Sequence, residues 1–487
     1  MSGDRELSGR DHTDMNEIPN LNAGRFSIVR RMIRRLVSRR IMRRILIGGA
    51  TMITLIAAYY ARADWRGARL WENAKREMDA KGEVWDWAAF VPAPVPDDQN
   101  IFKAPKMAAW FEDQRSLFDQ PLERRMTNDF ARRMFNTNST VEITSKPEAA
   151  AYLAWSDQFQ DDFNAIGAAL QRPYARITPD YTHPLSITVP NVATVYAVVK
   201  TLVQRAKCHL LLGQPEAAWR ELTLLHELRR IVENQGRFIT TEGDWMRREL
   251  ARHSLQVIAK GLELHAWRET QLVQIQEQLK DCDCIAQHVE ALRCARALML
   301  NSLEDGDFLK AVFHAGGDGL WTRIKKHPAL VLFSLAPRGI LLEKNANLAR
   351  DMGNSINTLT PANGVIHPAD AGKAFAWWKK AREGLPLLLR TQTLVNEGQI
   401  ACALERYRNA HGSYPEVIDT LVPRFIGRLP RDIVNGEPLR YRLTGDGGFL
   451  LYSVGWNEKD DGGKVVLANG GLTKMTEGDW VWQSYMY

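Results

Sequence analysis

The sequence lacks the short motifs that identify the large hydrolase and nucleotide-binding families. It contains no G-x-S-x-G, no GxxxxGK[ST] and no dinucleotide-binding glycine motif. Its 11 histidines form no recognisable metal site. His226-Glu227 is not followed by a second histidine four residues on, and His253 and His265 are too far apart on one helix to share an ion. The sequence therefore offers no candidate catalytic residue.

Cysteine is scarce, with five residues among 487. Cys282, Cys284 and Cys294 lie close together in the sequence, whereas Cys208 and Cys402 stand alone. These are too few thiolates for a structural zinc site, which takes four ligands. In an oxidising compartment one or two disulfides can form, but we favour the alternative that the cysteines are buried in helices as free thiols.

An excess of positive charge is found only at the N-terminus. Residues 1–44 carry 11 Lys and Arg against 5 Asp and Glu, and the rest of the chain carries 53 against 52. A nucleic-acid-binding protein needs a basic surface on its folded body. The charge balance therefore gives no reason to expect a nucleic-acid partner.

The long uncharged run of the sequence lies directly after nine arginines. No acid lies between Arg25 and Arg44, and residues 45–61 are 17 residues without a charge. As a helix they span roughly 26 Å, close to the hydrocarbon thickness of about 30 Å. We predict a basic cytoplasmic tail over residues 1–44 and a single-pass transmembrane helix over residues 45–63. By the positive-inside rule, the protein lies in a bacterial inner membrane with its main body periplasmic.

Two alternatives to this anchor exist. Ala61-Arg62-Ala63 has the A-x-A pattern of a signal-peptidase site, so cleavage before Asp64 would make the segment a signal peptide. Its 44-residue basic region is long for a signal peptide, and we therefore favour an uncleaved anchor. The second alternative is a buried core helix, for which nine arginines are unsuitable neighbours.

Residues 64–370 are predicted to form a mainly helical exported domain. A proline-rich strap over residues 85–100 interrupts the helices, and Asp97 and Asp98 are expected to cap a helix that starts near Ala104. Residues 205–228 resemble one tetratricopeptide-type helical hairpin, although no 34-residue repeat flanks it. We predict helices over residues 65–81, 192–212, 216–232, 245–267, 269–280, 285–304 and 338–358.

Residues 371–487 are predicted to form a small α+β domain. A long helix is expected over residues 374–410, with a weak point at Gly384-Leu385-Pro386, and the HGSYP segment after it ends the helix. A short helix over residues 416–422 should follow. Two strands over residues 438–444 and 449–454, joined by Gly445-Asp446-Gly447-Gly448, indicate an antiparallel β-hairpin.

The order of motifs in this region resembles the globular domain of type II secretion major pseudopilins. A helix ending in ALERYRNAHGSYP is followed by LP-x-D, NGEPLRY, YSVG, DDGG and DW. The resemblance covers residues 387–482, less than a quarter of the chain. The whole chain also resembles a group of membrane-anchored bacterial proteins that share the VPAPVPDDQN strap and this ending, which implies no activity.

The pseudopilin resemblance implies a calcium site in the last loop. Carried over onto this chain, the ligands are Asn457, Asp460, Asp461 and Asp479, with backbone carbonyls completing the six to eight oxygens that calcium takes. The alternative is that DDGG forms an ordinary acidic turn. The anchor lies more than 300 residues upstream and lacks a prepilin cleavage motif, so we do not expect this chain to polymerise as pseudopilins do.

Together these features predict a mainly α protein with an N-terminal transmembrane helix, a helical-hairpin body and an α+β C-terminal domain. The expected function is that of a non-enzymatic periplasmic scaffold or interaction protein, tied through the resemblance to a secretion or pilus-like assembly. Its expected partners are the inner membrane and envelope proteins. The alternatives are a periplasmic hydrolase and a ligand-binding protein acting on an envelope component.

Overall fold

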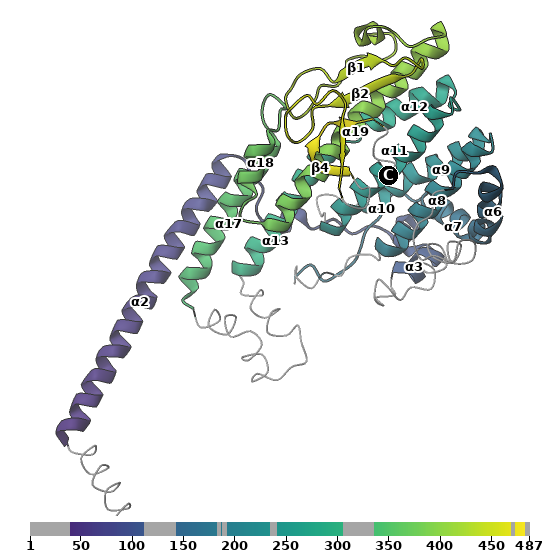
Figure 1. Ribbon diagram of the computed structural model, residues 1–487. Helices are drawn as coiled ribbons and strands as arrows, with labels where there is room; N and C mark the ends of the chain where they lie inside the picture. The colour runs from purple at the N-terminus through teal and green to yellow at the C-terminus, as the bar shows by residue number, and fades with distance from the viewer. Residues whose placement is uncertain are drawn as a thin grey trace, which may run out of the picture.

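The computed structural model describes residues 39–111, 143–182, 187, 192–233, 241–304, 336–468 and 473–482. The protein is mainly helical, with one long apolar helix near its N-terminus and a small antiparallel sheet at its C-terminal end (Figure 1). Of the predicted basic tail, residues 1–38 lie outside the described part. The helices are α2 (Arg39–Ala80), α3 (Pro105–Phe111), α6 (Lys146–Ser156), α7 (Gln160–Ala169), α8 (Val192–Leu211), α9 (Pro215–Leu228), α10 (Arg230–Glu233), α11 (Thr241–Glu263), α12 (Glu269–Lys280), α13 (Cys284–Glu304), α17 (Arg338–Leu359), α18 (Pro368–Ala374) and α19 (Lys379–His411).

Helix α2 is one uninterrupted helix of 42 residues. The predicted helix over residues 65–81 continues directly from the anchor segment, since no proline separates the two. The first half of α2 projects from the body (Figure 1) and exposes large apolar side chains such as Leu46, Ile53 and Leu55. Within the described residues it is the one helix long and apolar enough to cross a membrane.

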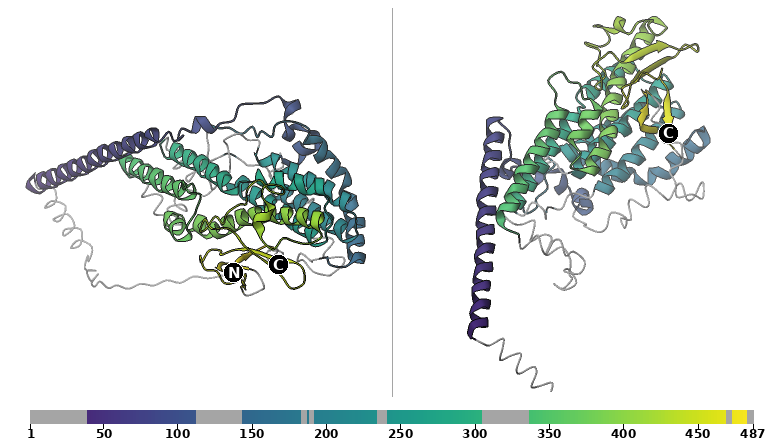
Figure 2. Two further views of the ribbon diagram at one scale, coloured as in Figure 1. Left: turned by 90° about the horizontal axis from the view of Figure 1, so that it is seen from above. Right: turned by 60° about the vertical axis from the view of Figure 1, so that its left-hand side comes forward.

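The second half of α2 packs against α17. Trp71 and Ala74 of α2 are buried together with Ala349 of α17. Near the start of this contact the two helix backbones touch, because a Cβ at Gly67 would lie 1.9 Å from the carbonyl oxygen of Gly339. Figure 2 shows α17 along this half of α2 in two further views.

The helical body and the C-terminal strands share one continuous hydrophobic core. The buried cluster includes Phe159, Leu202 of α8, Leu272 of α12, Leu404 of α19 and Trp480 of the last strand. Helix α19 lies between α11 and α12 on one side and the strands on the other. The helices before residue 370 and the strands after it therefore pack into the same hydrophobic core.

Three local predictions are corrected by the structure. Asp97 and Asp98 do not cap α3; they start the short 3₁₀ helix η2 (Asp97–Gln99), which Pro96 precedes. Asn100 instead caps η3 (Ile101–Lys103) by accepting the Phe102 N–H. The strap contains a further 3₁₀ helix, η1 (Trp87–Phe90), and η4 (Asp157–Phe159) joins α6 to α7.

The second correction concerns the end of α11. It ends at Glu263, because His265 takes a positive φ of 51° and turns the chain back. The Trp267 indole then packs beside Gly261 and donates a hydrogen bond to the Ile258 carbonyl. The residues after Glu263 are therefore apolar because the chain folds back onto α11, and not because the helix continues through them.

The third correction concerns α19, which starts at Lys379 and includes Pro386. The predicted weak point does not end the helix. Pro386 lies inside α19 and removes a main-chain hydrogen bond, but its neighbours Leu385 and Leu388 are buried in the core, and this packing keeps the helix continuous. Ala374 ends a separate helix, α18. At the other end Gly412 adopts φ 85° and caps α19, as the sequence predicted.

The predicted β-hairpin is confirmed. Strands β1 (Arg440–Leu443) and β2 (Phe449–Ser453) pair antiparallel with Tyr441 opposite Leu451, and β5 (Trp480–Val481) joins the other edge of β2. Strands β3 (Val465–Leu467) and β4 (Thr473–Gly478) form a separate pair. The predicted helix over residues 416–422 is a shorter 3₁₀ helix, η6 (Ile418–Leu421).

We predict that Gly67→Ala weakens the docking of α2 on α17. The added methyl group meets the Gly339 backbone, which cannot move as a side chain can, and overpacking of this kind costs about 1–3 kcal/mol. Gly49→Ala is the matched control on the same helix, since no atom lies within 4 Å of its Cβ position. Thermal melting of the full-length protein in detergent, followed by tryptophan fluorescence, measures the difference. Equal melting midpoints for the two variants would contradict the backbone contact.

Candidate functional site

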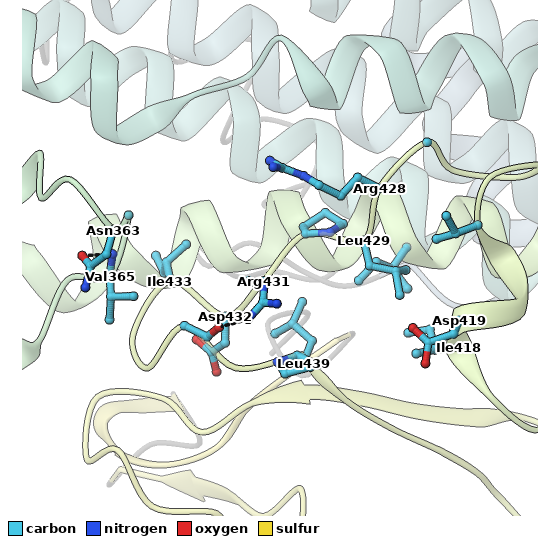
Figure 3. A pocket seen from close by; sticks show the side chains of 17 residues that line it. Asn363, Val365, Ile418, Asp419, Arg428, Leu429, Arg431, Asp432, Ile433 and Leu439 are labelled. Atoms are coloured by element: carbon cyan, nitrogen blue, oxygen red, sulfur yellow. Dashed lines mark hydrogen bonds between the residues drawn. The ribbon is translucent and has the colours of Figure 1, made fainter.

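A hollow lies where the helical body meets the C-terminal strands. It has a volume of about 710 Å³ and is lined by Ile400 of α19, residues 427–433, Pro438 and Leu439. Figure 3 shows Asn363 and Val365 at one end of it and Ile418 and Asp419 at the other.

A second hollow of about 560 Å³ shares part of its wall with the first. It is lined by α12, α19 and the turn before α13, and the two hollows have Gly427, Arg428, Pro430 and Arg431 in common. We call residues 423–431 the junction loop and the two hollows together the junction groove.

The junction loop is held by side chains that belong to the helices. The Arg406 guanidinium donates hydrogen bonds to the Phe425 carbonyl at 2.8 Å and to Gln276 Oε1 at 2.7 Å. The Gln276 amide donates to the same carbonyl at 3.1 Å. The Phe425 ring lies against Tyr407 and His411. The groove is therefore formed by a fixed loop, which keeps the ordering cost of binding low.

The second hollow has a strong excess of positive charge. Five cations line it, against the two acids Glu277 and Asp283. Arg424 lies over the Phe425 ring, and neither Arg424 nor Arg428 has a carboxylate partner among the described residues. Figure 3 shows Arg428 pointing away from Asp432 and toward the helices of the body. An unpaired arginine at a concave surface favours an anionic ligand. The cations are Lys280, Arg406, Arg424, Arg428 and Arg431.

Two buried carboxyl groups lie behind the first hollow. Asp432 lines it and accepts hydrogen bonds from the backbone N–H groups of Val434 and Val454, both at 3.1 Å. Glu397 of α19 is fully buried, and neither of its carboxyl oxygens accepts a well-formed hydrogen bond from the described residues. Burial, reinforced by the Asp432 charge, raises the pKa of Glu397 well above its usual range. Burial therefore favours the protonated form of Glu397, whereas Asp432 connects the junction loop to the end of β2.

Sequence reasoning missed Glu397, because a single glutamate in an amphipathic helix is normally solvent-exposed. A signal was nevertheless present. The residues three and four positions away on the same face, Leu394, Ile400 and Ala401, are all apolar and all buried. A charge in the middle of an apolar face predicts either a buried partner or a proton.

Three of the predicted calcium ligands, Asn457, Asp460 and Asp461, lie in the loop before β3, and Asp479 reaches this loop from the position between β4 and β5. Protein donors already occupy the carboxylate oxygens of this set. Asp479 accepts three backbone N–H groups, the shortest from Gly463 at 2.6 Å. Asp460 accepts from the Tyr452 hydroxyl and pairs with Arg440 at 3.2 Å, and Asp461 accepts from the Asn457 amide. In the described part of the chain, no three His, Cys, Asp or Glu side chains are grouped as a metal ion requires. The donor set suits a calcium ion only once Arg440 has left Asp460, and calcium binding stays a prediction.

The histidines and cysteines are dispersed over the described helices. His253 is buried beside Tyr196, and His265 pairs with Glu405 at 2.8 Å on another helix. All five cysteines are free thiols, as favoured over disulfides, and all except Cys282 are buried. Cys282 and Cys284 are the pair whose sulfur atoms approach each other.

Comparison of the chain with protein-family models, curated proteins and solved structures found no match. The resemblance to pseudopilins therefore rests on the motifs of residues 387–482 alone.

We predict that Glu397→Gln removes a pH-dependent loss of stability. Because the folded protein holds this proton more tightly than the unfolded chain, the wild type loses stability as the pH rises above about 4.3, the ordinary glutamate value. Glutamine has the shape of the protonated acid and does not titrate. Melting of the full-length protein at about pH 5 and about pH 8 should show the variant gaining relative to the wild type at the higher pH.

The matched control for this change is Glu416→Gln, which alters an exposed glutamate. The melting temperature of this control should change with pH as that of the wild type does. If Glu397→Gln also follows the wild type, Glu397 is not a buried proton-binding group.

The calcium prediction has its own measurement. A ligand that binds only the folded state at 100 times its Kd stabilises it by about 2.7 kcal/mol. The full-length protein should therefore melt at a higher temperature in millimolar calcium than in chelator, and Asp460→Ala with Asp461→Ala should abolish the difference. Identical melting of the wild type in both buffers would make the segment an ordinary acidic turn.

Proposed function

We propose that this protein is a membrane-anchored interaction protein whose junction groove binds an acidic segment of a partner in the bacterial envelope. The observation that carries the proposal is the second hollow of the groove, in which five cations face two acids. The pseudopilin resemblance implies a secretion or pilus-like assembly as the setting.

The anchor part of the proposal rests on the two halves of α2. The first half exposes its apolar side chains on all sides, which is unfavourable in water and favourable in a bilayer. The second half is docked on α17, so the body is held close to the end of the anchor. With the arginines that precede Ile45 placed in the cytoplasm, the body lies in the periplasm.

The groove part of the proposal rests on charge and rigidity. A carboxylate that approaches Arg424 and Arg428 finds guanidinium groups that no described acid neutralises. One hollow is sufficient for binding, because a short acidic segment meets several cations there. The first hollow adds apolar wall from Ile400, Leu429 and Leu439.

A hydrolase remains the second candidate, and the carboxyl pair is the observation that favours it. Asp432 lines the first hollow, the charge of Asp432 acts on Glu397 behind it, and burial raises the pKa of both acids, as in sites of acid–base catalysis. Two observations argue against this assignment. Glu397 is fully enclosed, and both carboxylate oxygens of Asp432 already accept hydrogen bonds from backbone N–H groups. Turnover of an envelope polymer that Asp432→Asn abolishes without loss of folding would favour the hydrolase.

The interaction proposal predicts a partner that cross-links from the groove. A photo-reactive amino acid in place of Arg428, in cells that express the full-length protein, should give a discrete cross-linked product. Lys373 is the control position, since it is exposed on α18 and borders neither hollow. Protease added to spheroplasts should remove the product, because the groove is on the outer side of the inner membrane.

The acidic chemistry is tested with purified protein in detergent. A labelled oligo-glutamate peptide should bind the wild type and bind at least about tenfold more weakly to Arg424→Glu with Arg428→Glu. An oligo-lysine peptide should not bind the wild type. Equal binding of oligo-glutamate to both proteins would overturn the groove assignment, and a cross-link that survives external protease would overturn the topology.

A further inference from the structure

Cys282 lies in the turn between α12 and α13 and Cys284 is the first residue of α13, with their sulfur atoms 3.9 Å apart. The backbone of this turn is fixed at several points. Asp283, between the cysteines, accepts the Ala286 N–H at 2.8 Å and so caps α13. The Cys284 N–H donates to Gln392 Oε1 of α19, also at 2.8 Å. The two thiols are therefore held side by side by the fold.

The two thiols differ in access. Cys284 is 1% exposed, whereas Cys282 is only partly buried. Cys282 borders the second hollow of the junction groove and also a smaller hollow of about 50 Å³, in which His226 and Arg229 lie. A thiol or disulfide from outside can therefore reach Cys282 first and Cys284 only through Cys282.

The pKa values of the two thiols also differ, and the more accessible Cys282 is the more acidic. A hydrogen bond from the Cys284 thiol lowers the pKa of Cys282 and raises that of Cys284, and the nearby Arg229 guanidinium further favours the Cys282 thiolate. The other charged groups that face the pair are Glu233 of α10, Asp283 in the turn, and Arg247 and Arg248 of α11.

We propose that Cys282 and Cys284 are a redox-active dithiol that exchanges with a disulfide-bearing partner, with Cys282 as the attacking thiol and Cys284 as the resolving thiol. The proposal goes beyond the binding of an acidic segment and does not depend on it. The geometry that supports it is the 3.9 Å sulfur separation together with the unequal access of the two thiols.

The exchange is balanced in two steps. The Cys282 thiolate attacks one sulfur of the partner disulfide, which forms a mixed disulfide and releases the first partner sulfur as a thiolate. The Cys284 thiol then loses its proton to that thiolate and attacks the sulfur of Cys282. The mixed disulfide breaks, the second partner thiolate leaves and takes a proton from water, and two electrons have passed to the partner. The reverse sequence reduces the pair at the expense of a partner dithiol.

Formation of the bond needs only a small movement. The sulfur atoms must approach from 3.9 Å to about 2 Å, which side-chain rotation in a turn can provide. The remaining cysteines, Cys208, Cys294 and Cys402, are buried in separate helices. They serve as internal controls, because buried free thiols are inert.

The test is a redox titration of the full-length protein in detergent, in mixtures of reduced and oxidised glutathione. After acid quenching, unfolding and alkylation, the tryptic peptide over residues 281–293 contains both cysteines of the pair. We expect this peptide to pass in one two-electron transition from two alkyl groups to none, with the loss of two hydrogen atoms. Cys208 should be alkylated throughout. Two alkyl groups at every ratio, or glutathione adducts without an internal disulfide, would overturn the proposal.

Variants separate the two roles. Cys284→Ser should accumulate a mixed disulfide between Cys282 and glutathione, and Cys282→Ser should leave Cys284 unmodified in the folded protein. Cys284→Ala should also slow alkylation of Cys282 at neutral pH several-fold, because the thiolate loses its hydrogen bond. Equal alkylation of Cys282 in Cys284→Ala and the wild type would overturn the assigned roles. If the variants fail to fold, the titration of the wild type still decides the proposal.

Discussion

The enclosure of helix α19 is the constraint on which the rest of the structure depends. From Leu385 to Glu405 this helix has neighbours on nearly every side, and polar residues along it are buried together with the apolar ones. A buried polar group that lacks a partner is costly. The buried polar side chains of α19 therefore need hydrogen-bond partners, and these hydrogen bonds position the loops around the helix.

The pairings of α19 account for the main features of the protein. Gln392 holds the turn of the two cysteines, and Arg406 holds the junction loop. Glu405 accepts a hydrogen bond from the Tyr414 hydroxyl and so fixes the segment that follows α19. Among the described residues of α19, Thr393 Oγ1 and the Glu397 carboxyl oxygens lack hydrogen-bond partners, and for Glu397 burial favours the protonated form. The groove and the cysteine pair are thus set by one helix, although their residues are far apart in the sequence.

The sequence predicted the elements that depend on local signals. The apolar run of α2, the Gly412 cap and the hairpin around residues 445–448 all follow from residues within one or two turns. Glu397, Asp432 and Arg406 could not be assigned this way, because their partners come from distant segments. The return of Trp267 onto α11 was missed for the same reason, because the indole packs beside Gly261 and donates to the Ile258 carbonyl, and these contacts outweigh the helical pattern of the segment. The groove itself has no sequence signature, since its arginines are scattered among basic residues that pair elsewhere.

A hydrogen-bond relay along α19 connects the cysteine turn to the junction loop. The Cys284 N–H donates to Gln392, the Gln392 amide donates to Asn396 at 3.2 Å, and the Asn396 amide donates to the Arg431 carbonyl at 3.4 Å. The N–H of Cys282 is also held, by the Leu279 carbonyl at the end of α12. The backbone N–H groups of both cysteines are thus held, and the same relay reaches the Arg431 carbonyl of the junction loop. The proposed thiol exchange and the proposed binding of an acidic segment therefore share one hydrogen-bonded framework.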